Sequence, residues 1–386
     1  MKVVVVAEFY PRAADPVLGV WAHRQALAAR DAGADVRVVV LHRPIAPAAQ
    51  ARDPRAWRTA AAQPARATLD GLPVRYVRYL SPPRGRGYAQ WGAWAAPTLG
   101  VALRRLRRRF PFDLVHAHYA VPAADAVLRA GVRAPLVVSE HGGDVFHTAR
   151  LPGGRARVAH AFGAARLVLA NSAGIERAVR GLGAKRTRVV HLGTDPAPLA
   201  HRRGGPPLLV TVAQLVARKR QADVLRAMWV LRDRRPELRY RIVGGGPEAG
   251  RLQALAAELG LADRVELTGP LPHDQAVRAA REASVFVMPS IDEAFGVAYV
   301  EAMAAGVPAI GARGEPGPEE IARFGEGLVL VPPGDPEALA AEIDALLERR
   351  WRDRAGAAAR AVVAEHFTWE RCGRETVRAY EDALRA

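Results

Sequence analysis

The hydrophobic pattern of the chain alternates short apolar runs with longer amphipathic segments. Residues 3–7 and 35–41 are apolar runs of strand length. Between them, residues 20–32 place apolar side chains at helical spacing and end before Gly33. Runs that are apolar throughout are typical of parallel strands covered on both faces. The opening therefore predicts a strand–helix–strand unit. Residues 42–90 are less regular, with a short alternating run at residues 74–80. The pattern then continues with strands at residues 113–116, 135–139, 166–170 and 188–191 and helices at residues 91–109, 121–130, 156–163 and 172–182.

A break in this alternation divides the chain into two halves. Residues 196–207 gather prolines, glycines and charges without any periodicity, which indicates a linker. The alternation then restarts, with strands predicted at residues 208–213, 238–243, 264–268, 285–288, 307–310 and 328–331, helices between them, and helix to the end. We expect an α/β protein with one Rossmann-like domain over residues 1–197 and a second over residues 207–366.

The composition is that of an ordinary globular protein. Of 386 residues, 50% are hydrophobic and 25% are charged, which suits two domains with ample cores. Cys372 is the only cysteine, so an internal disulfide and a cysteine-based zinc site are excluded. No uncharged stretch reaches the ~20 apolar residues of a spanning helix. We expect a cytoplasmic protein, either soluble or peripheral at the inner face of a membrane.

The positive charge of the chain has two explanations. Fifty-six basic side chains against 39 acidic ones give a net charge of +17, which fits either an anionic partner or the arginine-rich composition of a GC-rich genome. Residues 84–109 carry Tyr88, Trp91 and Trp94 and end in five arginines. This segment fits a helix lying on an anionic membrane surface, or equally an amphipathic helix with a solvated arginine face. Nucleic acid is disfavoured, because no recognition motif accompanies the charge.

The strongest chemical pattern lies in residues 288–306. A predicted strand ends at Pro289, a short loop carries Asp292 and Glu293, and a helix follows with Glu301 on its first turns. Ligands of open α/β sheets bind beyond the carboxyl ends of the strands, and a helix N-terminus favours an anion such as phosphate. Carboxylates accept hydrogen bonds from sugar hydroxyls. Phosphate and hydroxyls together describe a nucleotide sugar.

The spacing Glu293–x₇–Glu301, within the segment from Pro289 to Pro308, resembles the signature of the family 4 retaining glycosyltransferases, or glycosyl transferases group 1. Residues 212–219, 242–247, 265–269 and 328–335 resemble further motifs of that family, as do Gly19 and residues 113–118 and 141–144 in the first half. The resemblance covers nearly the whole chain. It implies a GT-B fold, in which two Rossmann-like domains face each other across a cleft and a last helix, residues 367–386, crosses back to the first domain.

The resemblance also implies an activity. Such enzymes move a hexosyl group from a UDP- or GDP-linked sugar to a glycan, a lipid-linked acceptor or a small molecule, with retention of the anomeric configuration. The leaving phosphate is thought to take the proton of the acceptor, so the reaction needs charge stabilisation more than a general base. The chain contains no Asp-x-Asp motif, which agrees with a transferase that uses neither a metal ion nor another cofactor.

Residue by residue, the resemblance implies catalytic roles for His141, Glu293 and Lys219. Donor contacts are implied for Gly19, Gln214, Arg218, Lys219, Gly246, Ser290, Phe295, Gly296, Val297 and Glu301, and positions on the acceptor side for His118 and Asp144. Glu293 is expected to touch the hydroxyls of the transferred sugar, Glu301 the ribose, and Lys219 the diphosphate. The family usually has an arginine where this chain has Gln214, so Arg218 is expected to compensate.

Two alternatives stay open. The turn from Gly244 to Gly246, with Ala249, fits a loose G-x-G-x-x-A after a strand, and Glu266 follows about twenty residues later, as in NAD(P)-dependent oxidoreductases. Gln214 instead allows a non-catalytic scaffold that keeps the glycosyltransferase fold but has lost the activity.

Overall fold

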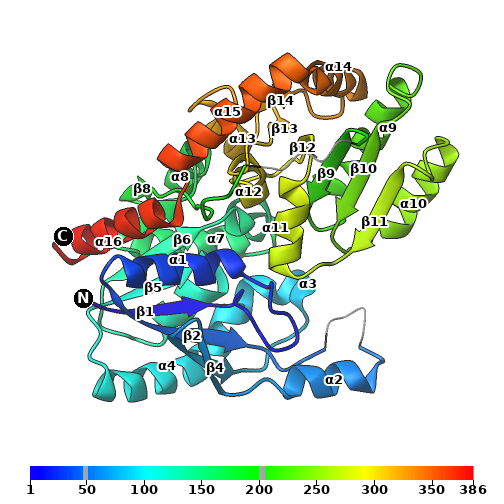
Figure 1. The fold of residues 1–386 in the computed structure, drawn as a ribbon. Helices are drawn as coiled ribbons and strands as arrows, with labels where there is room; N and C mark the ends of the chain where they lie inside the picture. Colours follow the sequence, from blue (N-terminus) through cyan, green and yellow to red (C-terminus); the bar gives the residue numbers. More distant parts are fainter. Residues whose placement is uncertain (47–50, 200–204, 386) are drawn as a thin grey trace. The chain divides into compact units, whose positions relative to one another are not determined.

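The computed structural model describes residues 1–46, 51–199 and 205–385, so part of the predicted linker, residues 200–204, lies outside the described residues. Its contacts group the chain into two compact units. Unit 1 comprises Met1–His191 and Trp369–Ala386, and unit 2 comprises Leu192–Thr368. Each unit is built around one sheet flanked by helices (Figure 1).

Unit 1 contains a sheet whose strands run in the order β3-β4-β2-β1-β5-β6-β7-β8. All neighbouring strands are parallel except β3, which pairs antiparallel with β4. Val3 to Val6 are fully buried, as expected for a central strand covered on both faces. The bounds are β1 (Lys2–Ala7), β2 (Asp35–His42), β3 (Arg66–Leu69), β4 (Leu72–Arg78), β5 (Leu114–His118), β6 (Leu136–Glu140), β7 (Leu167–Ala170) and β8 (Thr187–Val189).

The helices of unit 1 include one from the end of the chain. The predicted return of the last helix is confirmed: α16 packs beside α1 (Figure 1). The two helices lie so close that a Cβ on Gly373 would be 2.1 Å from the carbonyl oxygen of Ala28. The bounds are α1 (Val20–Asp31), α2 (Pro54–Ala61), α3 (Arg84–Gly87), α4 (Trp91–Arg109), α5 (Asp125–Arg129), α6 (Gly143–Phe146), α7 (Gly154–Ala164), α8 (Ala173–Gly181) and α16 (Trp369–Arg385).

Unit 2 contains a fully parallel sheet in the order β11-β10-β9-β12-β13-β14, which is the 3-2-1-4-5-6 order of a Rossmann fold. Its strands are β9 (Leu208–Val212), β10 (Arg239–Val243), β11 (Val265–Gly269), β12 (Val285–Met288), β13 (Ala309–Ala312) and β14 (Leu328–Val331). Its helices are α9 (Gln221–Val230), α10 (Ala249–Glu258), α11 (His273–Arg281), α12 (Val297–Met303), α13 (Pro316–Ala322), α14 (Pro336–Leu347) and α15 (Arg349–His366).

The predicted and observed elements differ in three places. The irregular stretch before residue 91 contains α2 and the β3–β4 hairpin, of which the sequence indicated only the alternating run at residues 74–80 that overlaps β4. The helix predicted at 121–130 is regular only over α5, because Val121 is extended. The strand predicted at 307–310 is β13, which begins two residues later than predicted, after Pro308.

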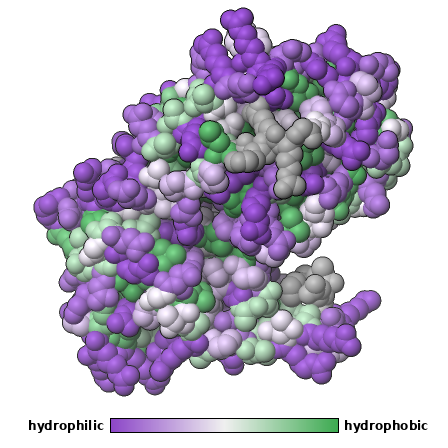
Figure 2. Space-filling model, viewed as in Figure 1, coloured by the Kyte–Doolittle hydropathy of each residue, from purple (hydrophilic) through white to green (hydrophobic). Residues whose placement is uncertain are grey.

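The face of the molecule seen in Figure 2 is mostly hydrophilic, with apolar side chains in small separate groups. None of the helices in the described ranges combines the length and the apolar character needed to cross a membrane.

Candidate functional site

The predicted site residues lie in two groups, one in each unit. In both sheets the strand order reverses at one point, between β9 and β12 in unit 2 and between β1 and β5 in unit 1. Loops at the carboxyl ends of the strands beside such a point form the ligand site of open α/β sheets. Lys219 and Glu293 follow β9 and β12, and His118 and His141 lie at the ends of β5 and β6.

The centre of the unit 2 group is a buried ion pair. Lys219 lies in a short 3₁₀ turn, Ala217–Lys219, and its Nζ is 2.5 Å from Oε2 of Glu293. Ser290 Oγ donates a hydrogen bond of 2.9 Å to the same carboxylate oxygen. Both charged residues are only 8% exposed. The structure therefore brings together three predicted residues that lie on two separate loops.

Burial and the partner charge act against each other in this pair. Burial alone would raise the pKa of Glu293, but the charge and hydrogen bond of Lys219 outweigh it and the pKa is lowered. Burial lowers the pKa of Lys219, and the negative charge of Glu293 opposes that shift. Glu293 is therefore ionised at neutral pH and held beside an ammonium group.

The backbone around this pair is fixed by further contacts of the two loops. Ile291 N donates to the carbonyl oxygen of Arg218 (2.9 Å), while the exposed Arg218 guanidinium donates to the carbonyl oxygen of Asp292 (3.3 Å). Glu315 Oε2 accepts a hydrogen bond from Glu293 N at 2.9 Å. Glu315 is thus a residue of the site that was not among the predicted site residues, because its segment, residues 314–320, departs from the corresponding motif of the family.

Gly296, Val297 and Phe295 stand where the loop enters α12. Gly296 has a left-handed backbone (φ 84°), and a Cβ there would lie 2.4 Å from the ring of Tyr299, so the position requires glycine. The Phe295 side chain is buried against Phe367, with ring centroids 5.6 Å apart, while Val297 is half-buried. The Phe295 side chain is therefore part of the core of unit 2, and only its backbone is left for a donor contact.

Glu301 lies one turn further along α12 and is half-buried. Its Oε1 is 3.8 Å from Nε2 of His273, and the Arg281 guanidinium donates a 3.3 Å hydrogen bond to its carbonyl oxygen. The carboxylate is separate from the Lys219–Glu293 pair, as two contacts to different parts of one ligand would require.

Gly246 lies on the loop after β10, and Gln214 lies on the loop after β9. A Cβ on Gly246 would lie 2.3 Å from the carbonyl oxygen of Leu215, and one on Gly244 would lie 1.9 Å from that of Ala213. The two glycines are thus explained by the close packing of the glycine turn against the loop after β9. Gln214 is exposed on that loop, and its carbonyl oxygen accepts a hydrogen bond from Gln221 at 3.2 Å.

The unit 1 group contains a chain of histidines. Nδ1 of His118 and Nε2 of His141 are 2.9 Å apart in a hydrogen bond, and the planes of the two rings are nearly parallel, with an interplanar angle of 5°. His116 is hydrogen-bonded to Tyr380 of α16 and to Ser139, both at 2.7 Å. Burial lowers the pKa of His116 and of His141 to about 3 and lowers that of His118 as well. All three rings are therefore neutral at physiological pH.

A buried pair of carboxyl groups lies beside the histidines. Glu140 Oε1 accepts hydrogen bonds from Gly142 N (2.6 Å) and Asp144 N (3.1 Å), and Asp144 Oδ2 accepts one from Ala120 N at 2.5 Å. Burial raises the pKa of Asp144 to about 6 and, together with the charge of Asp144, raises that of Glu140. The two carboxyl groups are close enough for their titrations to influence each other, and both have a raised pKa. Glu140 was not among the predicted site residues, although it is adjacent to His141.

Gly19 caps the N-terminus of α1 in a left-handed conformation (φ 67°). A Cβ there would lie 2.2 Å from the carbonyl oxygen of Phe9, in the loop after β1. The position accepts only glycine, and it holds the loop after β1 against the start of α1.

Across residues 1–46, 51–199 and 205–385, no three histidine, cysteine, aspartate or glutamate side chains are arranged to hold a metal ion. The side chains of the two groups suit anions and hydroxyls: they include two cationic side chains, two carboxylates and neutral imidazoles.

Two family descriptions together match nearly the whole chain. Residues 18–198 match the family described as Glycosyltransferase Family 4, and residues 200–362 match the family described as Glycosyl transferases group 1.

Curated relatives have related descriptions. A D-inositol 3-phosphate glycosyltransferase of Streptomyces bingchenggensis is 33% identical over 329 residues, which cover 76% of this chain and 70% of the relative. A GDP-mannose-dependent alpha-(1-6)-phosphatidylinositol monomannoside mannosyltransferase of Mycolicibacterium smegmatis is 30% identical over 298 residues, or 73% of each chain.

Solved structures show the same fold at lower identity. Sucrose-phosphate synthase from Thermosynechococcus elongatus aligns over 100% of both chains with a TM-score of 0.80 and 21% identity. Anabaena HepE in complex with UDP and glucose aligns over 99% of both chains with a TM-score of 0.72 and 19% identity.

Proposed function

The chain belongs to glycosyltransferase family 4 and is a transferase of GT-B fold; from this premise we propose that it moves a hexosyl group from a nucleotide-diphosphate sugar to an acceptor hydroxyl with retention of configuration. The observation that carries the proposal is the buried Lys219–Glu293 pair beside the point where the strand order of unit 2 reverses. It offers an ammonium group for a diphosphate and a carboxylate for sugar hydroxyls within one loop pair.

Unit 2 binds the donor in this proposal. Lys219 moves its hydrogen bonds to the leaving diphosphate, and the exposed Arg218 guanidinium supplies the cation that Gln214 does not. Glu293 then accepts hydrogen bonds from the hydroxyls of the transferred hexose, and Glu301 from those of the ribose. The relative from Mycolicibacterium smegmatis is described as GDP-mannose-dependent, and HepE was solved with UDP-glucose, so both bases belong in a test of the donor.

Unit 1 holds the acceptor side. His141 is neutral at physiological pH, and its Nδ1 has no hydrogen-bond partner among the described residues, so it is available to a sugar hydroxyl. Nδ1 of His118 fixes the orientation of the His141 ring by its hydrogen bond with Nε2 of His141, and Asp144 holds the preceding loop by accepting a hydrogen bond from Ala120 N. The proposal thus assigns the donor to unit 2 and the acceptor to unit 1.

The proposed chemistry is a same-face displacement. The bond between the anomeric carbon and the β-phosphate oxygen breaks, and a bond from the acceptor oxygen forms on the same face. The proton of the acceptor hydroxyl passes to the departing phosphate oxygen. Lys219 and Arg218 stabilise the charge that develops on the diphosphate, a role that makes the reaction independent of a metal ion and of other cofactors.

The acceptor in this proposal is a glycan, a lipid-linked saccharide or a small polyol, and the protein works in the cytoplasm or at the inner face of a membrane. The relatives named for inositol phosphate and phosphatidylinositol mannoside support an acceptor of this kind. Trp94 and Val101 are exposed on α4, which supports contact between residues 84–109 and a membrane surface. The family membership favours transfer over the oxidoreductase alternative.

A ligand screen tests the proposal. We expect UDP- or GDP-sugars to raise the melting temperature, because a ligand at 100 times its dissociation constant adds about 2.7 kcal/mol of stability. The bound sugar is then offered to candidate acceptors with and without EDTA, and the anomeric configuration of the product is read by NMR. An inverted product or loss of turnover in EDTA contradicts the mechanism; stabilisation by NADH and by no sugar nucleotide contradicts the activity itself.

A further inference from the structure

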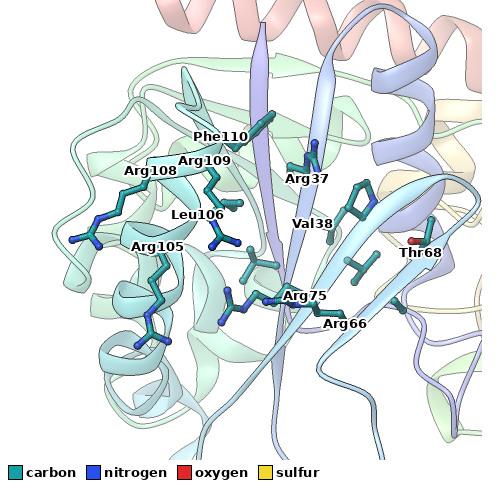
Figure 3. A pocket seen from close by; sticks show the side chains of 14 residues that line it. Arg37, Val38, Arg66, Thr68, Arg75, Arg105, Leu106, Arg108, Arg109 and Phe110 are labelled. Atoms are coloured by element: carbon teal, nitrogen blue, oxygen red, sulfur yellow. The ribbon is translucent and has the colours of Figure 1, made fainter.

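A cavity of about 780 Å³ in unit 1 is lined by arginines from the sheet and from a helix (Figure 3). Three come from the sheet and three from the end of α4: Arg37, Arg66, Arg75, Arg105, Arg108 and Arg109. In Figure 3 the side chains of Arg75 and Arg109 extend into the space between the strands and the helix, and those of Arg105 and Arg108 extend outward from the helix. No aspartate or glutamate is among the described residues that line this cavity.

The three arginines of the sheet lie on one face. Arg66 and Arg75 are directly opposite each other in the antiparallel β3–β4 pair. Val39 pairs with Arg75 in the β2–β4 ladder, so Arg37, two residues before Val39, lies on the same face as Arg75. Like charges directly opposite each other in a sheet are destabilising. This arrangement therefore works against the stability of the hairpin unless an anion lies between the guanidinium groups.

The three arginines of α4 repeat the pattern at helical spacing. Residues 105, 108 and 109 lie three and four positions apart and therefore share one side of the helix. The negative end of the helix dipole explains cations in this last turn. It does not explain the three arginines on the facing strands, which converge on the same cavity.

None of the six arginines forms an ion pair with a carboxylate of the described residues. Nε of Arg37 is buried without a hydrogen-bond partner there, while its guanidinium lies 5.1 Å from the ring centroid of Phe110. A buried donor without a partner is unfavourable, which indicates that an acceptor belongs beside it.

A second arginine-rich cavity, in unit 2, gives a comparison. There Arg235 is paired with Asp344 (2.7 Å) and Glu348 (2.5 Å), and Arg241 with Glu266 (2.7 Å) and Glu282 (3.1 Å). The two cavities therefore differ: the unit 2 cavity has acids among its described lining residues, and the cavity between the sheet and α4 has none.

We propose that the unit 1 cavity is a binding site for clustered phosphate groups, carried by a soluble polyphosphorylated molecule or by a phospholipid headgroup. The site is distinct from the loops of His118 and His141. Those loops follow the carboxyl ends of the strands, whereas Arg37 lies near the amino end of β2 and Arg109 ends α4 shortly before β5 begins. The ligand binds through charge-assisted hydrogen bonds from guanidinium groups, which match phosphate oxygens in geometry.

Two double variants with the same change of charge test the site in the full chain. Arg75→Gln/Arg109→Gln removes the two side chains that extend into the cavity. Arg55→Gln/Arg58→Gln removes two exposed arginines of α2 in the same unit. The probes are tripolyphosphate, followed by calorimetry, and phosphatidylcholine vesicles with and without cardiolipin, followed by flotation. Lys219 also offers a cation to phosphate and is unchanged in both double variants. The contribution of the cavity to binding is therefore the difference in affinity between the two variants.

We expect the cavity variant to weaken binding by at least about tenfold, because the loss of one charge-assisted hydrogen bond is enough to raise a dissociation constant by about that factor. The α2 variant is expected to weaken binding by less than about twofold. Tripolyphosphate binding with this pattern identifies a soluble ligand; cardiolipin-dependent flotation with this pattern identifies a lipid. Equal losses in both variants, or no binding of either probe by the wild-type chain, overturn the proposal.

The melting temperature of each ligand-free variant shows whether a substitution has damaged the fold. Removing one of two facing like charges is expected to leave the melting temperature of the ligand-free variants unchanged or slightly raised. If the Arg75 variant unfolds, Arg109→Gln alone, which changes only the exposed end of α4, replaces it, with Arg58→Gln as its control, and must show the larger loss of binding of the two.

Discussion

The loops at the carboxyl ends of β9 and β12 hold an ion pair of opposite charges, whereas the loops at the ends of β5 and β6 hold neutral imidazoles and two carboxyl groups without a cationic partner. In unit 2, Lys219 lowers the pKa of Glu293. In unit 1, His141 is neutral, and burial raises the pKa of both Glu140 and Asp144. Both pairs of loops occupy the same place on the same kind of sheet. The comparison shows that the fold supplies the position of a site, while the presence or absence of an opposite charge within reach decides its electrostatics.

The largest expected effect is on the charged site. Lys219→Ala leaves Glu293 buried without its cation and removes the proposed partner of the diphosphate. We expect turnover with a sugar nucleotide to fall by about two to three orders of magnitude. The free energy of unfolding is expected to fall by about 3–5 kcal/mol. Steady-state kinetics and denaturant unfolding measure the two effects, with Lys185→Ala, an exposed lysine of unit 1, as the control.

The double variant Lys219→Met/Glu293→Gln separates the two effects. It removes both charges, so it should regain most of the stability of the wild type while its turnover stays low. If turnover returned with stability, the pair would hold the fold of unit 2 and have no part in the reaction.

A smaller effect is expected in the neutral site. Tyr380→Phe removes the hydroxyl that is hydrogen-bonded to the buried Nδ1 of His116. We expect the free energy of unfolding to fall by about 1–3 kcal/mol, because a buried polar atom loses its partner. Tyr240→Phe, which loses a similar 2.7 Å contact with Thr211 in unit 2, is the matched variant. No loss for Tyr380→Phe would mean that α16 does not support the histidines of unit 1.

The smallest expected effect is on the pH dependence of stability, through the buried carboxyl groups of Glu140 and Asp144. Because the pKa values of Glu140 and Asp144 are raised, the folded chain binds protons more tightly than the unfolded chain from about pH 4 upward. Their contribution to stability is therefore complete in acid and is lost as pH rises through the raised values, near pH 6 for Asp144. Glu140→Gln keeps the shape of the protonated acid, so it should raise stability at pH 8 by about 1 kcal/mol and little at pH 4.

Unfolding curves recorded from pH 4 to pH 8 measure this difference, with the exposed Glu237→Gln as a control. A Glu140→Gln variant whose stability follows that of the wild type at every pH would show that the pair is ionised, and the contrast between the two sites would disappear.

The sequence predicted the fold well where apolar runs were long. The strands over Lys2–Ala7, Asp35–His42 and Val285–Met288 follow directly from buried runs. The β3–β4 hairpin was only partly predicted, because β3 alternates exposed and half-buried residues and lies at the edge of the sheet. A strand with so little buried surface gives a weak pattern.

The site could be predicted as residues but not as contacts. The resemblance to the family pointed to Lys219 and Glu293, which the structure joins although 74 residues separate them. Neither Glu315, which accepts a hydrogen bond from Glu293 N, nor Glu140, which accepts one from Asp144 N, was among the predicted site residues. Periodicity reports which face of an element is buried, but the partner of a loop side chain depends on where another loop ends.

The return of α16 to unit 1 has a consequence for the order in which the chain can fold during synthesis. Unit 2 is encoded between the two parts of unit 1, so the ribosome completes it first. Until α16 emerges, the surface of α1 around Ala28 is uncovered and His116 lacks the Tyr380 hydroxyl. A nascent chain stalled before residue 369 should therefore carry a finished second unit and an unfinished first one, open to chaperones and proteases.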